Sequence, residues 1–224
     1  TLMLKALVIA TFFAFFTVNA DAQFKRSVVV SASEPDAEIY VDGVLVGNGQ
    51  ATVTVRFNVC VNVVVSKIGF LTMETNYCNM QTRTKPPKSD FFKLEEDDAY
   101  IASVETDMAN IDIEIKAASN EEEAWKLLSQ IVTNYFDVIE VTDRETGYLR
   151  TAWTVQTFKQ NTIRTRLILK LGSTTPLTYK AKIVSEYSGE PGTSVKDDQK
   201  FKEWDRVLRK YENIIPEMQS RVTQ

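Results

Sequence analysis

Residues 34–47 read Glu34-Pro35-Asp36-Ala37-Glu38-Ile39-Tyr40-Val41-Asp42-Gly43-Val44-Leu45-Val46-Gly47, and this segment carries the strongest fold signal in the chain. Its Asp42-Gly43 pair lies between two short apolar runs whose β-branched residues are typical of strands. Asp-Gly favours the tight primed turn of a β-hairpin, because both central positions of that turn need a positive φ angle. The segment therefore predicts a hairpin, with Asp42, Gly43 and Gly47 as structural turn residues.

Further short strands are predicted on both sides of this hairpin. A second hairpin folds about Gly69, in Lys67-Ile68-Gly69-Phe70, and joins residues 59–66 to residues 71–77. The other strands are expected at residues 27–31, 38–41, 44–46 and 51–57. Because β-branched residues and turns alternate throughout, the sequence predicts an all-β domain over residues 23–81.

The chain contains two cysteines, Cys60 and Cys78. A hairpin folded about Gly69 sets Cys60 opposite Cys78, and opposed strand residues have Cβ atoms close enough for a bridge. The pair is therefore a candidate disulfide. The alternative is two separate thiols on strands of slipped register.

These hairpins resemble the PEGA domain, a small surface-associated β-module of bacterial and archaeal envelope proteins. The resemblance covers about residues 28–78 and rests on Pro35, Ala37, Tyr40-Val41-Asp42-Gly43, Gly47 and the Lys67-Ile68-Gly69-Phe70 turn. It implies a small β-sandwich, an envelope or surface setting, a binding or spacing role and no catalytic residues. The alternative is an unrelated hairpin-rich domain that uses the same turn chemistry.

The first residues have the composition of an export signal. Lys5 precedes an apolar run over residues 6–18, and Ala20-Asp21-Ala22 follows as a small-x-small cleavage pattern, so we expect a signal peptide over residues 1–22. The apolar run is shorter than the roughly 20 residues of a membrane-spanning helix, although an uncleaved membrane anchor is the alternative. No cysteine follows the run to accept a lipid. We therefore expect an exported protein in the periplasm, at the cell surface or at the outer membrane, without a membrane span after cleavage. Export also permits a disulfide.

Residues 82–98 are predicted to be a linker, because Pro86-Pro87 and alternating charges replace the apolar pattern there. The formal net charge of −4 gives no support to nucleic-acid binding.

Residues 99–224 are predicted to form an α+β domain of order β-α-β-β-β-α, with helices on one face of an antiparallel sheet. Ile111, Ile113 and Ile115 alternate with charged residues as in a strand. Ser119-Asn120-Glu121-Glu122 then predicts the start of a helix that ends near Phe136. Three strands are expected over residues 138–157, 162–171 and 177–187. The last helix is expected along the stripe Phe201, Trp204, Leu208, Tyr211, Ile215 and Met218, with Pro216 breaking or kinking it near its end.

This order, with Gly147-Tyr148-Leu149-Arg150-Thr151-Ala152-Trp153, looks like the helix-grip domains of small outer-membrane lipoproteins, the subunits that accompany outer-membrane β-barrel assembly. The likeness implies a fold and no activity.

Seven polar or charged residues of the three strands are out of phase with the core and are predicted to share the opposite face of the sheet. They are Tyr148, Arg150, Arg164, Arg166, Lys170, Lys180 and Lys182. A basic patch on an acidic protein indicates docking to an anionic envelope component or an acidic protein surface. The alternative is an ordinary solvated sheet face.

Catalysis has little support in the sequence. The chain has no histidine, which excludes histidine triads and most zinc sites. Acidic runs at residues 95–98 and 121–123 leave a two-carboxylate glycoside hydrolase as a remote alternative. Asp36, Asp42 and Asn48 could bind calcium, but turn chemistry already explains them. The sequence predicts no catalytic residue, cofactor or metal.

Taken together, these features predict a non-catalytic exported protein of a bacterial cell envelope. As an accessory interaction module it would bind an envelope protein or a polysaccharide of the cell wall. The alternative is a structural spacer or surface component without a specific ligand. An exposed aromatic residue such as Tyr77 or Tyr148 beside the basic face would favour the interaction module.

Overall fold

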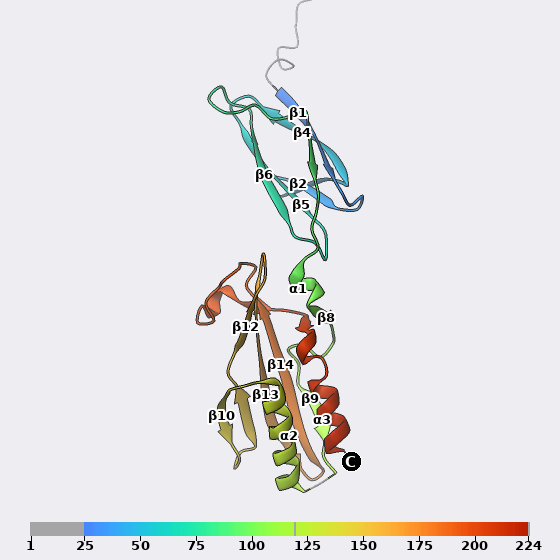
Figure 1. The fold of residues 1–224 in the computed structure, drawn as a ribbon, viewed down its shortest axis with the longest axis vertical. Helices are drawn as coiled ribbons and strands as arrows, with labels where there is room; N and C mark the ends of the chain where they lie inside the picture. The colour runs from blue at the N-terminus through green and yellow to red at the C-terminus, as the bar shows by residue number, and fades with distance from the viewer. Residues whose placement is uncertain (1–24, 119, 224) are drawn as a thin grey trace, which may run out of the picture. The chain divides into compact units, whose positions relative to one another are not determined.

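The computed structural model describes residues 25–118 and 120–223. Over these ranges the chain forms mostly antiparallel β-sheet with a few helices (Figure 1), as the sequence predicts. It divides into two compact units: unit 1 ends at Glu95 and unit 2 begins at Glu96. The predicted signal peptide lies outside the described residues. None of the helices within them is both long enough and apolar enough to cross a membrane.

Unit 1 consists of two small sheets that share one core. Its strands are β1 (Lys25–Ala32), β2 (Glu38–Val41), β3 (Val44–Asn48), β4 (Gln50–Arg56), β5 (Cys60–Ser66), β6 (Met73–Cys78) and β7 (Ser89–Phe92). One sheet has the order β4-β1-β7 and the other the order β3-β2-β5-β6. Alternate residues of both sheets, such as Val30, Val53 and Val63, are buried in the same cluster, so the strand periodicity of the sequence fills the space between the sheets.

The turn between β2 and β3 has the backbone geometry of a primed turn. Asp42 and Gly43 have φ angles of 49° and 81°, which match the right-handed twist of the flanking strands. The Asp42 carboxylate also accepts a hydrogen bond of 2.9 Å from the backbone N–H of Asn62 in β5. The hairpin is therefore joined to the next strand of its sheet by its own turn residue. Gly69, between β5 and β6, has a φ angle of 84°.

Gly49, between β3 and β4, leaves less room for a Cβ atom than the predicted turn residues Gly43 and Gly47 do. Its φ angle is +66°, and a Cβ atom there would overlap the backbone of Pro35, whereas a Cβ atom on Gly43 would meet open space. We expect Gly49→Ala to lower the free energy of unfolding of unit 1 by about 2 kcal/mol, because backbone strain and a steric clash add. Gly43→Ala is the matched control, since it carries only the strain. Urea unfolding of both variants tests this expectation, and equal losses would contradict it.

The predicted linker over residues 82–98 is wrong in its second half. Ser89–Phe92 forms β7, which pairs in parallel with β1, and Phe92 and Leu94 are buried in the core of unit 1. Asp97 then caps α1 (Asp98–Ile101) by accepting a hydrogen bond from the N–H of Ala99. The two prolines correctly indicate an interruption of regular structure. The segment after them becomes a strand because pairing with β1 covers the open edge of that strand and burial of apolar side chains is favourable.

Unit 2 consists of a large sheet, a two-stranded ribbon and helices. After α1 come β8 (Ser103–Glu105), β9 (Ile113–Lys116), α2 (Glu121–Tyr135), β10 (Ile139–Asp143), β11 (Tyr148–Thr151), β12 (Thr154–Thr157), β13 (Thr162–Thr174), β14 (Leu177–Tyr187), β15 (Lys202–Glu203), β16 (Arg206–Leu208) and α3 (Ile214–Val222), with 3-10 turns η2 (Asp198–Lys200) and η3 (Arg209–Tyr211). The large sheet has the order β10-β11-β13-β14-β15, with β12 beside β13 and β9 beside β14, and β16 pairs with β8.

Helices α2 and α3 cover one face of this sheet (Figure 1). Ala124, Leu128 and Ile131 of α2 are fully buried in one cluster with residues of α3 and of the sheet. Asn120 caps α2, because its side chain accepts a hydrogen bond of 3.0 Å from the N–H of Glu123. The opposite face of the sheet carries neither α2 nor α3, and we call it the open face.

The single strand expected over residues 138–157 is three strands. Asp143 accepts hydrogen bonds from the N–H groups of Glu145 and Thr146, and Gly147 has a φ angle of 64°. These residues turn the chain between β10 and β11. A second break at 152–153 separates β11 from β12, and both strands then pair with β13.

The helix expected along residues 201–218 is also wrong in its first half. Residues 202–211 form β15, β16 and η3, and only Ile214–Val222 is α-helical. Apolar residues spaced three and four apart can also occur in an irregular segment that packs on a core. Here the pairing of Arg206–Leu208 with β8 overrides the helical preference of the local pattern. Pro216 lies in the first turn of α3, where a missing N–H breaks no helical hydrogen bond.

Candidate functional site

The seven residues predicted to share a face of the sheet lie on β11, β13 and β14. Antiparallel pairing places Tyr148, Lys170 and Lys180 opposite one another across the three strands. One step further along, Arg150 and Lys182 both lie opposite Ile168. Arg166 and Arg164 continue the same side of β13, because alternate residues of a strand point the same way. Their neighbours in sequence, such as Leu167 and Leu169, are buried in the core beneath the helices.

Acidic side chains pair with most of the cations of the open face, so it is not the bare basic patch that the sequence predicts. Arg150 contacts Glu140 at 3.0 Å. Lys170 and Lys182 both contact Asp112, at 2.7 and 3.5 Å, and the hydrogen bond from Lys170 lowers the pKa of the Asp112 carboxyl. The sequence did not predict the contacts of Glu140 and Asp112. Glu140 depends on the pairing of β10 with β11 and Asp112 on the path of the chain before β9, and local pattern predicts neither.

Arg164 is buried and is the most extensively bonded cation of the sheet. Its side chain is 4% exposed and contacts the carboxylates of Glu186 and Asp198, each at 2.6 Å. Its guanidinium also donates a hydrogen bond of 2.8 Å to the carbonyl of Val195. A buried arginine with this many partners is primarily a structural residue.

Aromatic rings cover the same arginines. The guanidinium carbon of Arg164 lies 4.1 Å from the ring centre of Phe201 and 4.2 Å from that of Trp153. Arg166 lies 4.1 Å from the same Trp153 ring. Phe201, Arg164, Trp153 and Arg166 form what we call the arginine–aromatic cluster, in which cation–π contacts hold each guanidinium in place.

Arg166 differs from Arg150 and Arg164 because it forms no ion pair with a described residue, although the charges of Glu186 and Glu140 favour its protonated form. Its Nε atom is buried and has no hydrogen-bond partner in the part of the chain that the structure describes. Burial, and then the nearby charge of Arg150, lower the pKa of the Arg166 guanidinium, which still stays protonated at neutral pH. Lys180, the last of the seven residues, is exposed.

The two tyrosines singled out from the sequence have different surroundings. Tyr148 is partly exposed and lies on the open face beside Lys170. Tyr77 is 4% exposed, and its hydroxyl donates a hydrogen bond of 2.7 Å to Asp90, so it is a core residue of unit 1. Burial, aided by Asp90, raises the pKa of Tyr77. The exposed-aromatic criterion is therefore met by Tyr148 and not by Tyr77.

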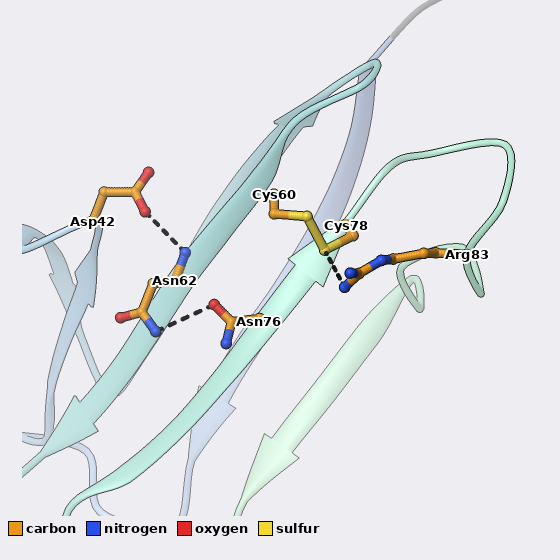
Figure 2. The surroundings of a disulfide bond; sticks show 6 residues. All are labelled: Asp42, Cys60, Asn62, Asn76, Cys78 and Arg83. Carbon is orange, nitrogen blue, oxygen red and sulfur yellow. Dashed lines mark hydrogen bonds between the residues drawn. A yellow bond between two sulfur atoms is a disulfide. The ribbon is translucent and has the colours of Figure 1, made fainter.

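The predicted disulfide is present. Cys60 and Cys78 are directly opposed on β5 and β6 and are bonded to each other, as Figure 2 shows. Asn62 and Asn76, the next paired positions on the same side of the ladder, share a hydrogen bond of 3.3 Å. The bridge therefore lies in the same register as the neighbouring pairs of the β-ladder.

No protein-family model and no curated protein matches this chain. The resemblance of unit 1 to the PEGA domain therefore stays a prediction.

Lys67 of the Lys-Ile-Gly-Phe turn contacts Glu34 at 2.8 Å and Asp36 at 2.7 Å, which ties the two hairpin motifs together. The hydrogen bond from Lys67 lowers the pKa of the Asp36 carboxyl. Asp36 and Asp42 are thus engaged within unit 1. No group of three His, Cys, Asp or Glu side chains that could hold a metal ion occurs among residues 25–118 and 120–223.

Proposed function

We propose that the protein is a non-catalytic, exported interaction module of a bacterial cell envelope, and that its open face binds an acidic segment of a partner protein at Arg166. The observation that carries this proposal is a guanidinium held against Trp153, whose buried Nε atom has no acceptor among the residues that the structure describes. A desolvated polar group without a partner costs free energy. A partner carboxylate does not reach the buried Nε atom itself. It would pair with Arg166 where this residue is partly exposed, because the two carboxylate oxygens match the planar fork of an arginine.

The charge pairing of the surrounding face supports this location. Lys170, Lys182 and Arg150 are already bonded to Asp112 and Glu140, so they offer less to a partner than Arg166 does. Lys180 and Tyr148 lie on the same face opposite Lys170, four residues along β13 from Arg166. They are an exposed cation and a partly exposed ring, which suit the rim of a binding surface.

We also propose that unit 1 is a PEGA-like module and that unit 2 is helix-grip-like. The support in unit 1 is the primed Asp42-Gly43 turn and the Lys67 contacts with Glu34 and Asp36. The support in unit 2 is that α2 and α3 lie together on one face of the sheet.

Charge reversal at Arg166 tests the docking proposal. The full chain, carrying a tag, is purified from envelope extract together with its principal partner. We expect the Arg166→Glu variant to carry at least tenfold less of this partner, because reversing a desolvated charge costs about 2–5 kcal/mol of binding free energy. Lys180→Glu, at an exposed position of the same face, should reduce recovery less.

Lys210→Glu is the matched control, since Lys210 is exposed in η3 outside the large sheet. Circular dichroism and thermal unfolding verify that each variant is folded. Unchanged recovery with folded Arg166→Glu and Lys180→Glu would refute docking at this face and favour the structural spacer.

A further inference from the structure

Two adjoining hollows border Trp125 on the helix side of unit 2. Their volumes are about 210 and 400 Å³, and Glu122, Trp125 and Arg144 line both. Glu121 and Tyr179 complete the smaller hollow, and four further α2 residues complete the larger one. Together they form what we call the Trp125 groove, between the outer side of α2 and the turn that joins β10 to β11.

The aromatic ring in this groove rests on a fixed support. The Trp125 and Tyr179 ring centres are 6.3 Å apart, with ring planes at 34°, and Tyr179 is 1% exposed. Burial raises the pKa of Tyr179, so the phenol is neutral at physiological pH. Trp125 is partly buried against the core, which fixes a large ring at the edge of an open hollow.

The charges of the groove balance. The groove is lined by two carboxylates, Glu121 and Glu122, and by two cations, Lys126 and Arg144. A site without net charge gives no electrostatic preference for an anion or a cation. It favours a neutral ligand that is recognised by hydrogen bonds and by contact with an aromatic ring.

The polar groups are also available to a ligand. Arg144 contacts Glu122 at 3.3 Å, but the two side chains are 61% and 78% exposed. An exposed ion pair of this kind contributes little free energy, so both groups can turn to a ligand at small cost. Gln130, which lines the larger hollow, adds an amide that both donates and accepts.

We infer that the Trp125 groove binds a neutral oligosaccharide. A pyranose ring has an apolar face of C–H groups that packs on an indole and a rim of hydroxyl groups that pair with carboxylate, guanidinium and amide side chains. The groove offers these two kinds of surface together. It lies on the helix side of the sheet, whereas Arg166 lies on the open face, so this inference and the docking proposal succeed or fail separately.

Titration of the full chain with defined oligosaccharides tests the inference. The neutral probes are tetra-N-acetylchitotetraose, cellotetraose and maltotetraose, with tetragalacturonate as the charged counterpart. The readout is the indole N–H resonance of Trp125 together with calorimetry. We expect at least one neutral probe to bind and to shift this resonance. Trp125→Ala should weaken binding at least tenfold, whereas Arg166→Glu should leave it unchanged.

Trp125→Ala removes a partly buried ring and could reduce stability, so Glu122→Gln and Arg144→Met provide a second test at exposed positions. We expect each to weaken binding several-fold with unchanged thermal unfolding. Three results would overturn the inference. The first is that no neutral probe binds with a dissociation constant below about 10 mM, which corresponds to about 3 kcal/mol of binding free energy. The others are that only tetragalacturonate binds, or that all three groove variants bind as well as the unmodified protein.

Discussion

Arg164→Ala is expected to lower the free energy of unfolding of unit 2 by about 3–5 kcal/mol, the range found when one partner of a buried ion pair is removed. The substitution leaves Glu186, whose side chain is 19% exposed, without its cation. It also removes the hydrogen bond to the Val195 carbonyl and the filling between the Trp153 and Phe201 rings. The contacts of Arg164 with Val195 and Phe201 tie the segment after β14 to the sheet. We therefore expect both this segment and the sheet to be less protected in Arg164→Ala.

Two controls separate the burial of Arg164 from its charge. Arg150→Ala removes a cation of the same face whose side chain is 32% exposed in its contact with Glu140, and it should cost about 1 kcal/mol or less. Arg164→Lys keeps the charge but lacks the planar fork, so it should recover only part of the loss. Denaturant unfolding and amide hydrogen exchange of β13 and β14 measure these effects. Equal losses for Arg164→Ala and Arg150→Ala would contradict the structural role given to Arg164.

Replacing both cysteines, as Cys60→Ser with Cys78→Ser, is expected to lower the free energy of unfolding of unit 1 by about 3 kcal/mol. The bridge joins residues 18 positions apart, and a closed loop of that length removes this amount of chain entropy from the unfolded state. Reduction of the unmodified protein should have the same effect. Five residue pairs besides the cysteines also hold β5 and β6 in this register, so the variant should still fold.

Amide hydrogen exchange measures this loss in each unit separately, which matters because a chain of two units need not unfold in one step. Protection should fall in β5 and β6 and stay unchanged in β13 and β14. Addition of reductant to the double variant is the control and should change nothing further. Unchanged protection of β5 and β6 would show that packing alone, through residues such as Val63 and Val65, sets the stability of unit 1.

The sequence predicts those elements of this fold whose signal is local. Asp42-Gly43 determines a turn by its own backbone preference, and Asn120 begins a helix with its own side chain. The alternation along β11, β13 and β14 is strong enough to place seven residues on one face, and the hairpin folded about Gly69 is enough to set Cys60 opposite Cys78. In each case the determining interactions lie within one element or between neighbours in the chain.

The elements that depend on distant pairing were not predictable in this way. Ser89–Phe92 becomes a strand because β1 has an open edge, and Arg206–Leu208 becomes one because β8 lies beside it. The charge of the open face was misjudged for the same reason. Asp198 reaches Arg164 from outside the predicted strands, and Asp112 reaches Lys170 because its segment lies beside β14, which local pattern does not predict. Trp125, which the sequence shows only as one residue of an amphipathic helix, gains its significance from the nearby β10–β11 turn.

The parallel pairing of β1 with β7 has a mechanical consequence for unit 1. The chain enters this unit through the start of β1 and leaves it after the end of β7, and Val29–Ala32 lies beside Ser89–Phe92. A force that pulls the two ends apart therefore slides the two strands past each other instead of peeling them open. The hydrogen bonds along this pair, from Val29 with Lys88 to Ser33 with Phe92, must then yield together. Unit 1 should therefore resist a force applied along the chain more strongly than a domain whose terminal strands peel apart one hydrogen bond at a time.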